Sequence, residues 1–199
     1  ASPTQAKCHL SCDDALLNPF ELTDMDLAVG RVRLALARGE KIAVFGDYDV
    51  DGITATCLLT HYLREQGAEC ISYIPGRLEE GYGLNPIAIH QLKNEGVQLI
   101  ITVDCGITAV EEALLCQQLG IDLVITDHHE CKDTLPQAVA VVNPHRPDGG
   151  YPHMNLSGVG VAFKLAAALN GDQQAVLEEY ADMVCLGTVA DVMPLLGEN

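Results

Sequence analysis

The sequence predicts an α/β domain built on a mostly parallel sheet with helices on both faces. Short runs rich in Val and Ile, such as 41–46 and 98–103, alternate with segments of roughly 12 residues that have helical periodicity. The chain has 199 residues, of which 48% are hydrophobic, so it can bury one sizeable core. No internal repeat or long linker divides it, and we therefore expect one domain.

The expected elements follow one another in regular alternation. An irregular N-terminal arm is expected over 1–23 and a core domain over 24–199. Strands are expected at 41–46, 68–74, 98–103, 121–126 and 138–142. Helices are expected at 24–38, 53–66, 85–94, 108–119, 159–169 and 174–186. Parallel sheets of this kind bind ligands beyond the carboxyl ends of their strands, so residues that follow strands are the first candidates for chemistry.

The composition of the chain indicates the cellular compartment in which we expect it. The sequence contains eight cysteines but no CxxC motif, which is typical of reduced thiols in a cytoplasmic protein. No apolar stretch approaches the roughly 18 residues of a transmembrane helix, and the first residues lack the pattern of a signal peptide. We therefore expect no membrane association.

The net charge is −17, with only 11 Lys and Arg residues, and this charge limits the kinds of substrate that the chain could bind by itself. A protein that grips nucleic acid by itself usually presents a basic face. Two explanations remain open. Either the acidity belongs to a metal site and a solvated surface, with the substrate gripped by domains outside this chain, or the substrate is small.

Three carboxylates follow the first predicted strand at alternate positions: Asp47, Asp49 and Asp51, with Gly52 after them. Carboxylates this close repel one another, and a hard divalent cation such as Mg²⁺ or Mn²⁺ removes the conflict. A solvated acidic loop that caps the next helix is the alternative interpretation, because Asp is favoured at helix N-caps.

Three further segments repeat the pattern of an apolar run that ends in Asp or His. Asp104 follows the strand at 98–103, and Asp127, His128 and His129 follow the strand at 121–126. Asp191 lies in a largely apolar stretch near the C-terminus. Each segment alone also suits a helix cap or a polar loop, but together they predict a two-metal site with one bridging carboxylate.

The order and spacing of these motifs resemble the DHH phosphoesterase family. DYDVDG at 47–52, Asp104, the DHH signature at 127–129 and Asp191 in GTVADVMPL match its four motifs in turn. The segments GYGLNP at 81–86, Asn143-Pro144 and SGVGVAFK at 157–164 are similar to the RecJ branch of that family. The resemblance begins at about residue 18 and covers nearly all of the chain.

The resemblance implies a role for each matching residue. Asp104 corresponds to the bridging carboxylate, His129 to a donor that stabilises the scissile phosphate, and Asp127 to a residue that orients the histidines. Asp47 corresponds to an outer-shell residue or a conditional ligand. The implied ligands of two Mn²⁺ or Mg²⁺ ions are Asp49, Asp51, Asp104, His128 and Asp191.

One position departs from the family pattern. Many members carry a His two residues before the first Asp of the motif, and here that position is Phe45. The departure puts one ligand of the first metal in doubt, with Asp47 or water as the substitute.

Contacts with the substrate are less sharply indicated. Arg77 is one of few cations near the predicted loops, where it would contact phosphate or lie at the surface. His145, close to Asn143-Pro144, would reach the site or belong to an ordinary loop. Gly158 and Gly160 would let backbone N–H groups approach a phosphate at a helix N-terminus, or would serve tight helix packing. Lys164 is expected at the surface.

RecJ-like proteins are 5′-to-3′ exonucleases that release 5′-mononucleotides from single-stranded DNA in DNA repair and recombination, and this is the function that the resemblance implies. Further domains of such proteins are expected outside this chain, where they would grip the strand and contact single-strand-binding protein and helicase. Two rival hypotheses stay open. One is a DHH hydrolase of short oligonucleotides or cyclic dinucleotides, and the other is a non-catalytic replication scaffold of the same fold.

Overall fold

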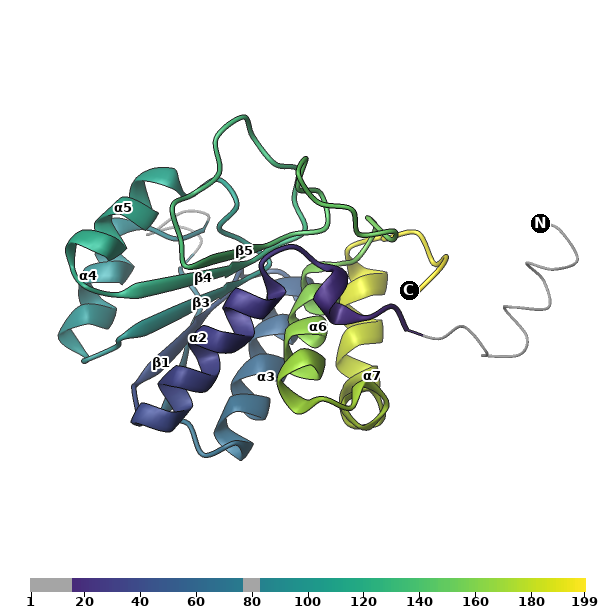
Figure 1. The fold of residues 1–199 in the computed structure, drawn as a ribbon, viewed down its shortest axis with the longest axis horizontal. Helices are drawn as coiled ribbons and strands as arrows, with labels where there is room; N and C mark the ends of the chain where they lie inside the picture. The colour runs from purple at the N-terminus through teal and green to yellow at the C-terminus, as the bar shows by residue number, and fades with distance from the viewer. Residues whose placement is uncertain (1–15, 77–82) are drawn as a thin grey trace, which may run out of the picture.

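The computed structural model describes residues 16–76 and 83–199, and within these ranges five parallel strands form one sheet. Its strand order is β2-β1-β3-β4-β5 (Figure 1). The strands are β1 (Ile42–Phe45), β2 (Cys70–Tyr73), β3 (Leu99–Val103), β4 (Asp122–Thr126) and β5 (Ala140–Val142). The side chains of β1 and β3 are fully buried, as their continuous apolar sequences require of central parallel strands.

Helices cover both faces of this sheet, which confirms the predicted fold class (Figure 1). One face packs against α2, α3, α6 and α7, and the other against α4 and α5. The helices are η1 (Pro19–Glu21), α2 (Met25–Arg38), α3 (Val50–Glu65), α4 (Pro86–Asn94), α5 (Val110–Gln118), α6 (Gly158–Asn170) and α7 (Gln173–Ala190). In the described ranges, none of them is both long enough and apolar enough to cross a bilayer.

The order of the strands places a topological switch point between β1 and β3. The chain leaves β1 toward β2 through α3 on one face, and returns to β3 through α4 on the opposite face. Strand order therefore reverses at β1, and the connections that leave β1 and β3 run to opposite faces of the sheet. Open α/β sheets bind their ligands at such a switch point.

Two helix boundaries differ from those predicted by three residues or more, and both differences affect candidate residues. Helix α3 begins at Val50, because the Asp49 side chain caps it by accepting a hydrogen bond from Gly52 N (2.9 Å). Asp51 thus lies in the first helical turn. Helix α7 continues to Ala190, so Asp191 is its C-terminal cap.

The described part of the expected arm packs against the core. Leu22 is 1% exposed and belongs to the cluster of buried side chains under α2 and α6, and Leu16 and Leu17 contact the same cluster. Packing of the domain therefore begins earlier than the expected boundary at residue 24.

The expectation for Lys164 is wrong, since its side chain is only 1% exposed. Helix α6 lies between α2, α3 and α7, so few of its positions reach water. The Lys164 ammonium donates to Leu17 O (2.8 Å) and Gln173 Oε1 (3.3 Å) and forms an ion pair with Glu198. These contacts join the first and last described segments of the chain.

Candidate metal centre

Carboxylates and histidines from separate elements meet at the carboxyl edge of the sheet. We call them the carboxylate–histidine cluster. Its members are Asp47, Asp49, Asp51, Asp104, His128, His129 and Asp191. Donor atoms lie within 4.8 Å of one another in three overlapping sets: Asp47–Asp49–Asp104, Asp104–His128–His129 and Asp51–His128–Asp191. The structure therefore brings together every candidate metal ligand that the sequence indicated.

His128 occupies the middle of this cluster. Its Nε2 lies 3.1 Å from Asp104 Oδ1, 3.7 Å from Asp191 Oδ2 and 3.8 Å from Asp51 Oδ2. Burial opposes protonation of the ring, yet the hydrogen bond with Asp104 raises the pKa of His128 overall. One imidazole is thus shared by carboxylates from three different elements.

Asp104 is the most constrained carboxylate of the cluster. Its φ of 58° places it in the left-handed region, which a non-glycine residue rarely adopts, and its side chain is 2% exposed. Burial raises the pKa of this carboxyl. A divalent cation at this point would compensate the charge that burial penalises.

Asp127 fixes the backbone and the ring of the DHH signature. Its Oδ1 accepts hydrogen bonds from His128 N (2.7 Å), His129 N (3.1 Å) and His129 Nδ1 (2.7 Å), and its Oδ2 accepts one from Ile107 N (2.9 Å). The hydrogen bond with Asp127 raises the pKa of His129 to about 9. His129 is about half exposed, whereas Asp127 is 1% exposed, so a buried carboxylate holds an accessible cationic ring.

Gly158 and Gly160 do not offer their N–H groups to a substrate phosphate. Gly158 N donates to Asp51 Oδ2 (2.6 Å), and Gly160 N donates to the capping Ser157 Oγ (3.2 Å). Val159 N donates to Asp51 Oδ1 (2.8 Å). An internal carboxylate therefore occupies the N-terminus of α6. Close packing explains Gly158, where a Cβ would lie 2.4 Å from the Cβ of Asp104, but not Gly160, where the nearest atoms would lie at an ordinary 3.5 Å.

The remaining candidates lie apart from the cluster or beyond the described residues. Arg77 falls in the segment 77–82, outside the described residues. The backbone of His145 donates to Asn143 Oδ1 (2.7 Å) and its ring lies 3.5 Å from Glu130 Oε1, outside the three donor sets. Phe45 stacks on Tyr73 with ring centroids 5.3 Å apart, so an apolar pair occupies the position of the family histidine.

Asn143 contacts the DHH signature, and the sequence interpretation did not predict this contact. Its side-chain amide donates to His129 O (2.9 Å), and the residue is 2% exposed at the end of β5. The available signal was a polar residue directly after the fifth predicted strand, as at the other strand ends.

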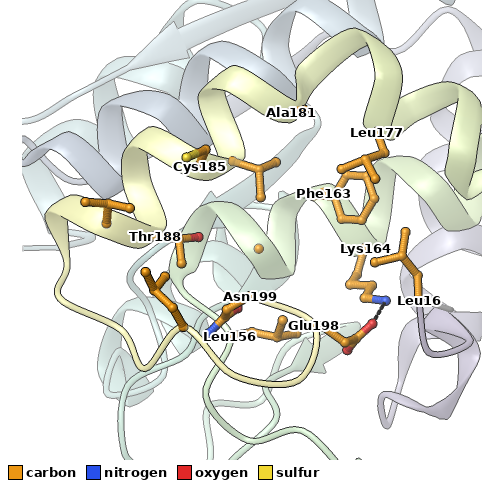
Figure 2. A pocket seen from close by; sticks show the side chains of 14 residues that line it. Leu16, Leu156, Phe163, Lys164, Leu177, Ala181, Cys185, Thr188, Glu198 and Asn199 are labelled. Atoms are coloured by element: carbon orange, nitrogen blue, oxygen red, sulfur yellow. Dashed lines mark hydrogen bonds and ion pairs between the residues drawn. The ribbon is translucent and has the colours of Figure 1, made fainter. Parts of the chain in front are cut away.

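An apolar cavity of about 360 Å³ lies between α6, α7 and the C-terminal segment (Figure 2). Phe163, Leu177 and Val184 line it, and the Lys164–Glu198 ion pair closes one end. None of the seven cluster side chains lines this cavity, so we place the chemistry at the cluster and not here.

A further group, His61, Glu65 and Glu179, is exposed, and Tyr180 OH lies 2.8 Å from His61 Nδ1.

The donor atoms of the cluster suit hard divalent cations. Carboxylate oxygens predominate, and this favours Mg²⁺ or Mn²⁺, while the imidazole nitrogen of His128 suits Mn²⁺ better than Mg²⁺. The buried Asp104 belongs to two of the donor sets, and its two carboxylate oxygens would allow it to contact two ions.

Curated relatives share most of this chain, which spans about a quarter to a third of their length. It is 46% identical over 195 residues to the single-stranded-DNA-specific exonuclease RecJ of Bacillus subtilis, covering 98% of this chain and 24% of that protein. It is 41% identical over 192 residues to RecJ of Escherichia coli, covering 90% of this chain and 33% of that protein.

Solved structures give the same relationship in three dimensions. A manganese-bound exonuclease RecJ superposes with a TM-score of 0.78 at 38% identity, covering 88% of this chain and 45% of that one. RecJ of Thermus thermophilus with Mn²⁺ gives 0.77 at 34% identity, covering 96% of this chain and 27% of that one. The model of the DHH family, N-terminal domain, matches residues 41–188, which include the first three motifs and most of the helical layer. The chain therefore belongs to the DHH family.

Proposed function

We propose that this chain is the catalytic core of a metal-dependent phosphodiesterase that degrades single-stranded DNA from its 5′ end and releases 5′-mononucleotides. The observation that carries the proposal is the meeting of Asp49, Asp104 and His128 at the ends of adjacent strands. Likeness to RecJ proteins, named as single-stranded-DNA-specific exonucleases, supports the choice of substrate.

Different residues of the cluster would have different roles in hydrolysis. Asp49, Asp51, Asp104, His128 and Asp191, with Asp47 as a conditional ligand, would hold two Mn²⁺ or Mg²⁺ ions. When bound, such ions neutralise phosphate charge and lower the pKa of an attacking water. Asp104 would serve both ions, since it belongs to two donor sets.

His129 would contact the phosphate. Asp127 Oδ1 accepts a hydrogen bond from His129 Nδ1, and His129 Nε2 therefore faces away from Asp127. A half-exposed ring held in this way would donate from Nε2 to a phosphate oxygen and stabilise its developing charge. Asp127 thus acts through His129 and does not itself touch the substrate.

The net charge of −17 favours a second candidate, hydrolysis of short oligonucleotides or cyclic dinucleotides. In the first candidate, domains outside this chain supply the cationic grip on DNA and the contacts with single-strand-binding protein and helicase.

The six described cysteines are free thiols, which supports a cytoplasmic setting. Retention of the cluster residues argues against a non-catalytic scaffold.

The test is cleavage of single-stranded DNA labelled at its 5′ end or its 3′ end, with Mn²⁺, beside an Asp104→Asn variant. Release of labelled mononucleotide first from the 5′-labelled strand, with none from the variant, is expected. Cleavage of a dinucleotide but not of the long strand would select the second candidate. Absence of both activities, with Mn²⁺ bound in a calorimetric titration, would exclude this chain as a self-sufficient catalyst.

Removal of the metal gives an independent check. The unfolding midpoint of the chain should rise on addition of Mn²⁺ and return on addition of EDTA, because an ion that binds only the folded state stabilises it by about 2.7 kcal/mol at 100 times its Kd. A midpoint that does not respond to Mn²⁺ would contradict the proposed metal centre.

A further inference from the structure

The turn that follows Asp191 has an unusual backbone. Helix α7 ends there, and Met193 N donates to Thr188 O (3.1 Å) across the turn. Between them Val192 has a φ of 57°, in the left-handed region. In the described ranges, the other non-glycine residues with positive φ are two aspartates, a residue type that tolerates this region far better than a β-branched one. A strained residue therefore lies directly beside a candidate metal ligand.

The side chain of Val192 does not explain this conformation. It is 86% exposed, so burial of the valine contributes nothing that would offset the strain. A backbone conformation of this kind persists only where the surrounding structure fixes it. The constraint therefore has to come from the chain on either side of Val192, which is α7 before it and the segment 193–199 after it.

Glu198 fixes the far end of that segment to the core (Figure 2). Its Oε1 accepts hydrogen bonds from Leu17 N (2.7 Å) and from the Lys164 ammonium, and its Oε2 accepts one from the Tyr151 hydroxyl. The Glu198 side chain is only 7% exposed. The three donors belong to the N-terminal arm, to α6 and to the loop before α6, so one buried carboxylate joins the C-terminal segment to three separate parts of the domain.

The neighbours of Glu198 bind the same segment to the loop before α6. Asn199 Nδ2 donates to Asn155 O (2.5 Å) and to Pro194 O (3.0 Å). Gly197 has a φ of 62°, and a Cβ there would lie 2.7 Å from His153 Nδ1. The segment 193–199 is therefore closely packed at the end that carries Glu198, and it is joined at its other end to the strained turn.

Asp191 is the cluster residue that depends most on this turn. Its Oδ2 lies 3.7 Å from His128 Nε2, in the donor set that it shares with His128 and Asp51. Its side chain is 31% exposed, whereas those of Asp51 and Asp104 are 1% and 2% exposed. Packing alone therefore holds Asp191 less firmly than the other two carboxylates, and its position depends on the backbone at the end of α7.

We propose that Glu198 is a positioning residue of the metal centre. Its buried carboxylate holds the segment 193–199 against the core, keeps the strained turn at Val192 closed, and in this way places Asp191 for metal binding. Glu198 itself touches neither ion nor substrate. The inference rests on the proposed function and adds a residue that acts on the metal centre through another.

The experiment compares Glu198→Gln, Val192→Gly, the double variant and Glu40→Gln with the unaltered chain. Glu40→Gln is the matched control, because Glu40 is a similarly buried carboxylate that pairs with Arg31 before β1, at the opposite edge of the sheet. The Kd for Mn²⁺ is measured by calorimetric titration at a temperature at which every variant is folded. Hydrogen exchange of the Met193 amide and the unfolding midpoint are measured on the metal-free chain.

We expect Glu198→Gln to raise the Kd for Mn²⁺ by about 10-fold or more, as for other residues that orient ligands. Its Met193 amide should exchange faster by a similar factor, because the turn opens locally once the segment is released. Glu40→Gln should lower the unfolding midpoint but leave the Kd and the exchange of Met193 unchanged, which separates positioning from general stability.

Val192→Gly should reverse the effect of Glu198→Gln. Glycine adopts a positive φ without strain, so in the double variant the turn closes without the Glu198 carboxylate and the Kd returns toward that of the unaltered chain. An unchanged Kd in Glu198→Gln would overturn the proposal. A raised Kd that Val192→Gly does not lower would also overturn it, because the effect would then not pass through the turn.

Tyr151→Phe covers the case in which Glu198→Gln does not fold. It removes one hydrogen bond to Glu198 and leaves the charge of Lys164 compensated. Its Kd should rise by a smaller factor, which Val192→Gly should again reverse, and an unchanged Kd would count against the proposal. If the unaltered chain binds no Mn²⁺, the proposed function fails, whereas exchange of the Met193 amide still tests whether Glu198 keeps the turn closed.

Discussion

The Nε2 atom of His128 lies 3.1 Å from Oδ1 of Asp104, and this contact joins the ends of two adjacent strands, β3 and β4. Both side chains are buried, at 8% and 2% exposed. Burial raises the pKa of Asp104, so its charged form carries a cost in the metal-free chain. Local stability and metal binding are therefore opposed at this residue.

Asp104→Asn should separate these two effects. Mn²⁺ affinity and any phosphodiesterase activity should fall by more than about 100-fold, because even outer-shell residues of metal sites are worth 10- to 100-fold. The metal-free unfolding midpoint should rise, since a neutral amide replaces a carboxylate that burial penalises. Calorimetric titration and thermal unfolding measure the two effects, with the exposed Asp133→Asn as control. A lower metal-free midpoint would contradict our account of Asp104.

His129 should make metal-free stability depend on pH. Its pKa in the folded chain is raised to about 9 by the hydrogen bond to Asp127, above the ordinary value of 6.5. A raised pKa contributes stability that is fully present below about pH 6.5 and is lost as the pH rises through about 9. The difference in midpoint between the unaltered chain and His129→Gln should therefore be largest near pH 6 and shrink toward pH 10. A difference that stays constant over this range would argue against the ion pair.

The same substitution at two helical glycines should have opposite effects. A Cβ at Gly187 of α7 would lie 2.5 Å from Thr54 Oγ1 and 2.7 Å from Asp51 Oδ1. Gly187→Ala should therefore lower the free energy of unfolding by about 1–3 kcal/mol. A Cβ at Gly30 of α2 meets nothing within 4 Å, so Gly30→Ala should raise it by about 0.5–1 kcal/mol. Urea unfolding of both variants measures these changes in the free energy of unfolding. A stabilised Gly187→Ala would refute the close packing of α7 on Asp51.

Lys164→Ala should be among the most destabilising single substitutions in the chain, because the lysine side chain is buried. It leaves Glu198, which is 7% exposed, without its ion-pair partner, and breaking a buried pair costs about 3–5 kcal/mol. Lys93→Ala, on the exposed side of α4, should cost less than about 0.5 kcal/mol and serves as the matched control. Equal losses in the two variants would show that the Lys164 contacts contribute little.

Local sequence patterns were sufficient for much of the site. Asp104 and His128 each follow a run of buried Val, Ile or Leu, and in a parallel sheet such runs end at one edge. Their meeting could thus be predicted without knowledge of any contact. The N-cap at Asp49 is also local, yet the sequence predicts the start of α3 three residues too late, because the same carboxylate suits a cap and a metal ligand equally well.

Sequence by itself determined the parallel α/β fold, the strand ends that carry the carboxylates and the DHH signature, because all three depend on residues that are neighbours along the chain. Only the tertiary structure decided which carboxylate faces a helix N-terminus and which lysine is buried. Asp51 meets Gly158 across 107 positions, and Lys164 meets Leu17 across 147. No periodicity records such pairings, since they arise from the packing of α6 between its neighbouring helices.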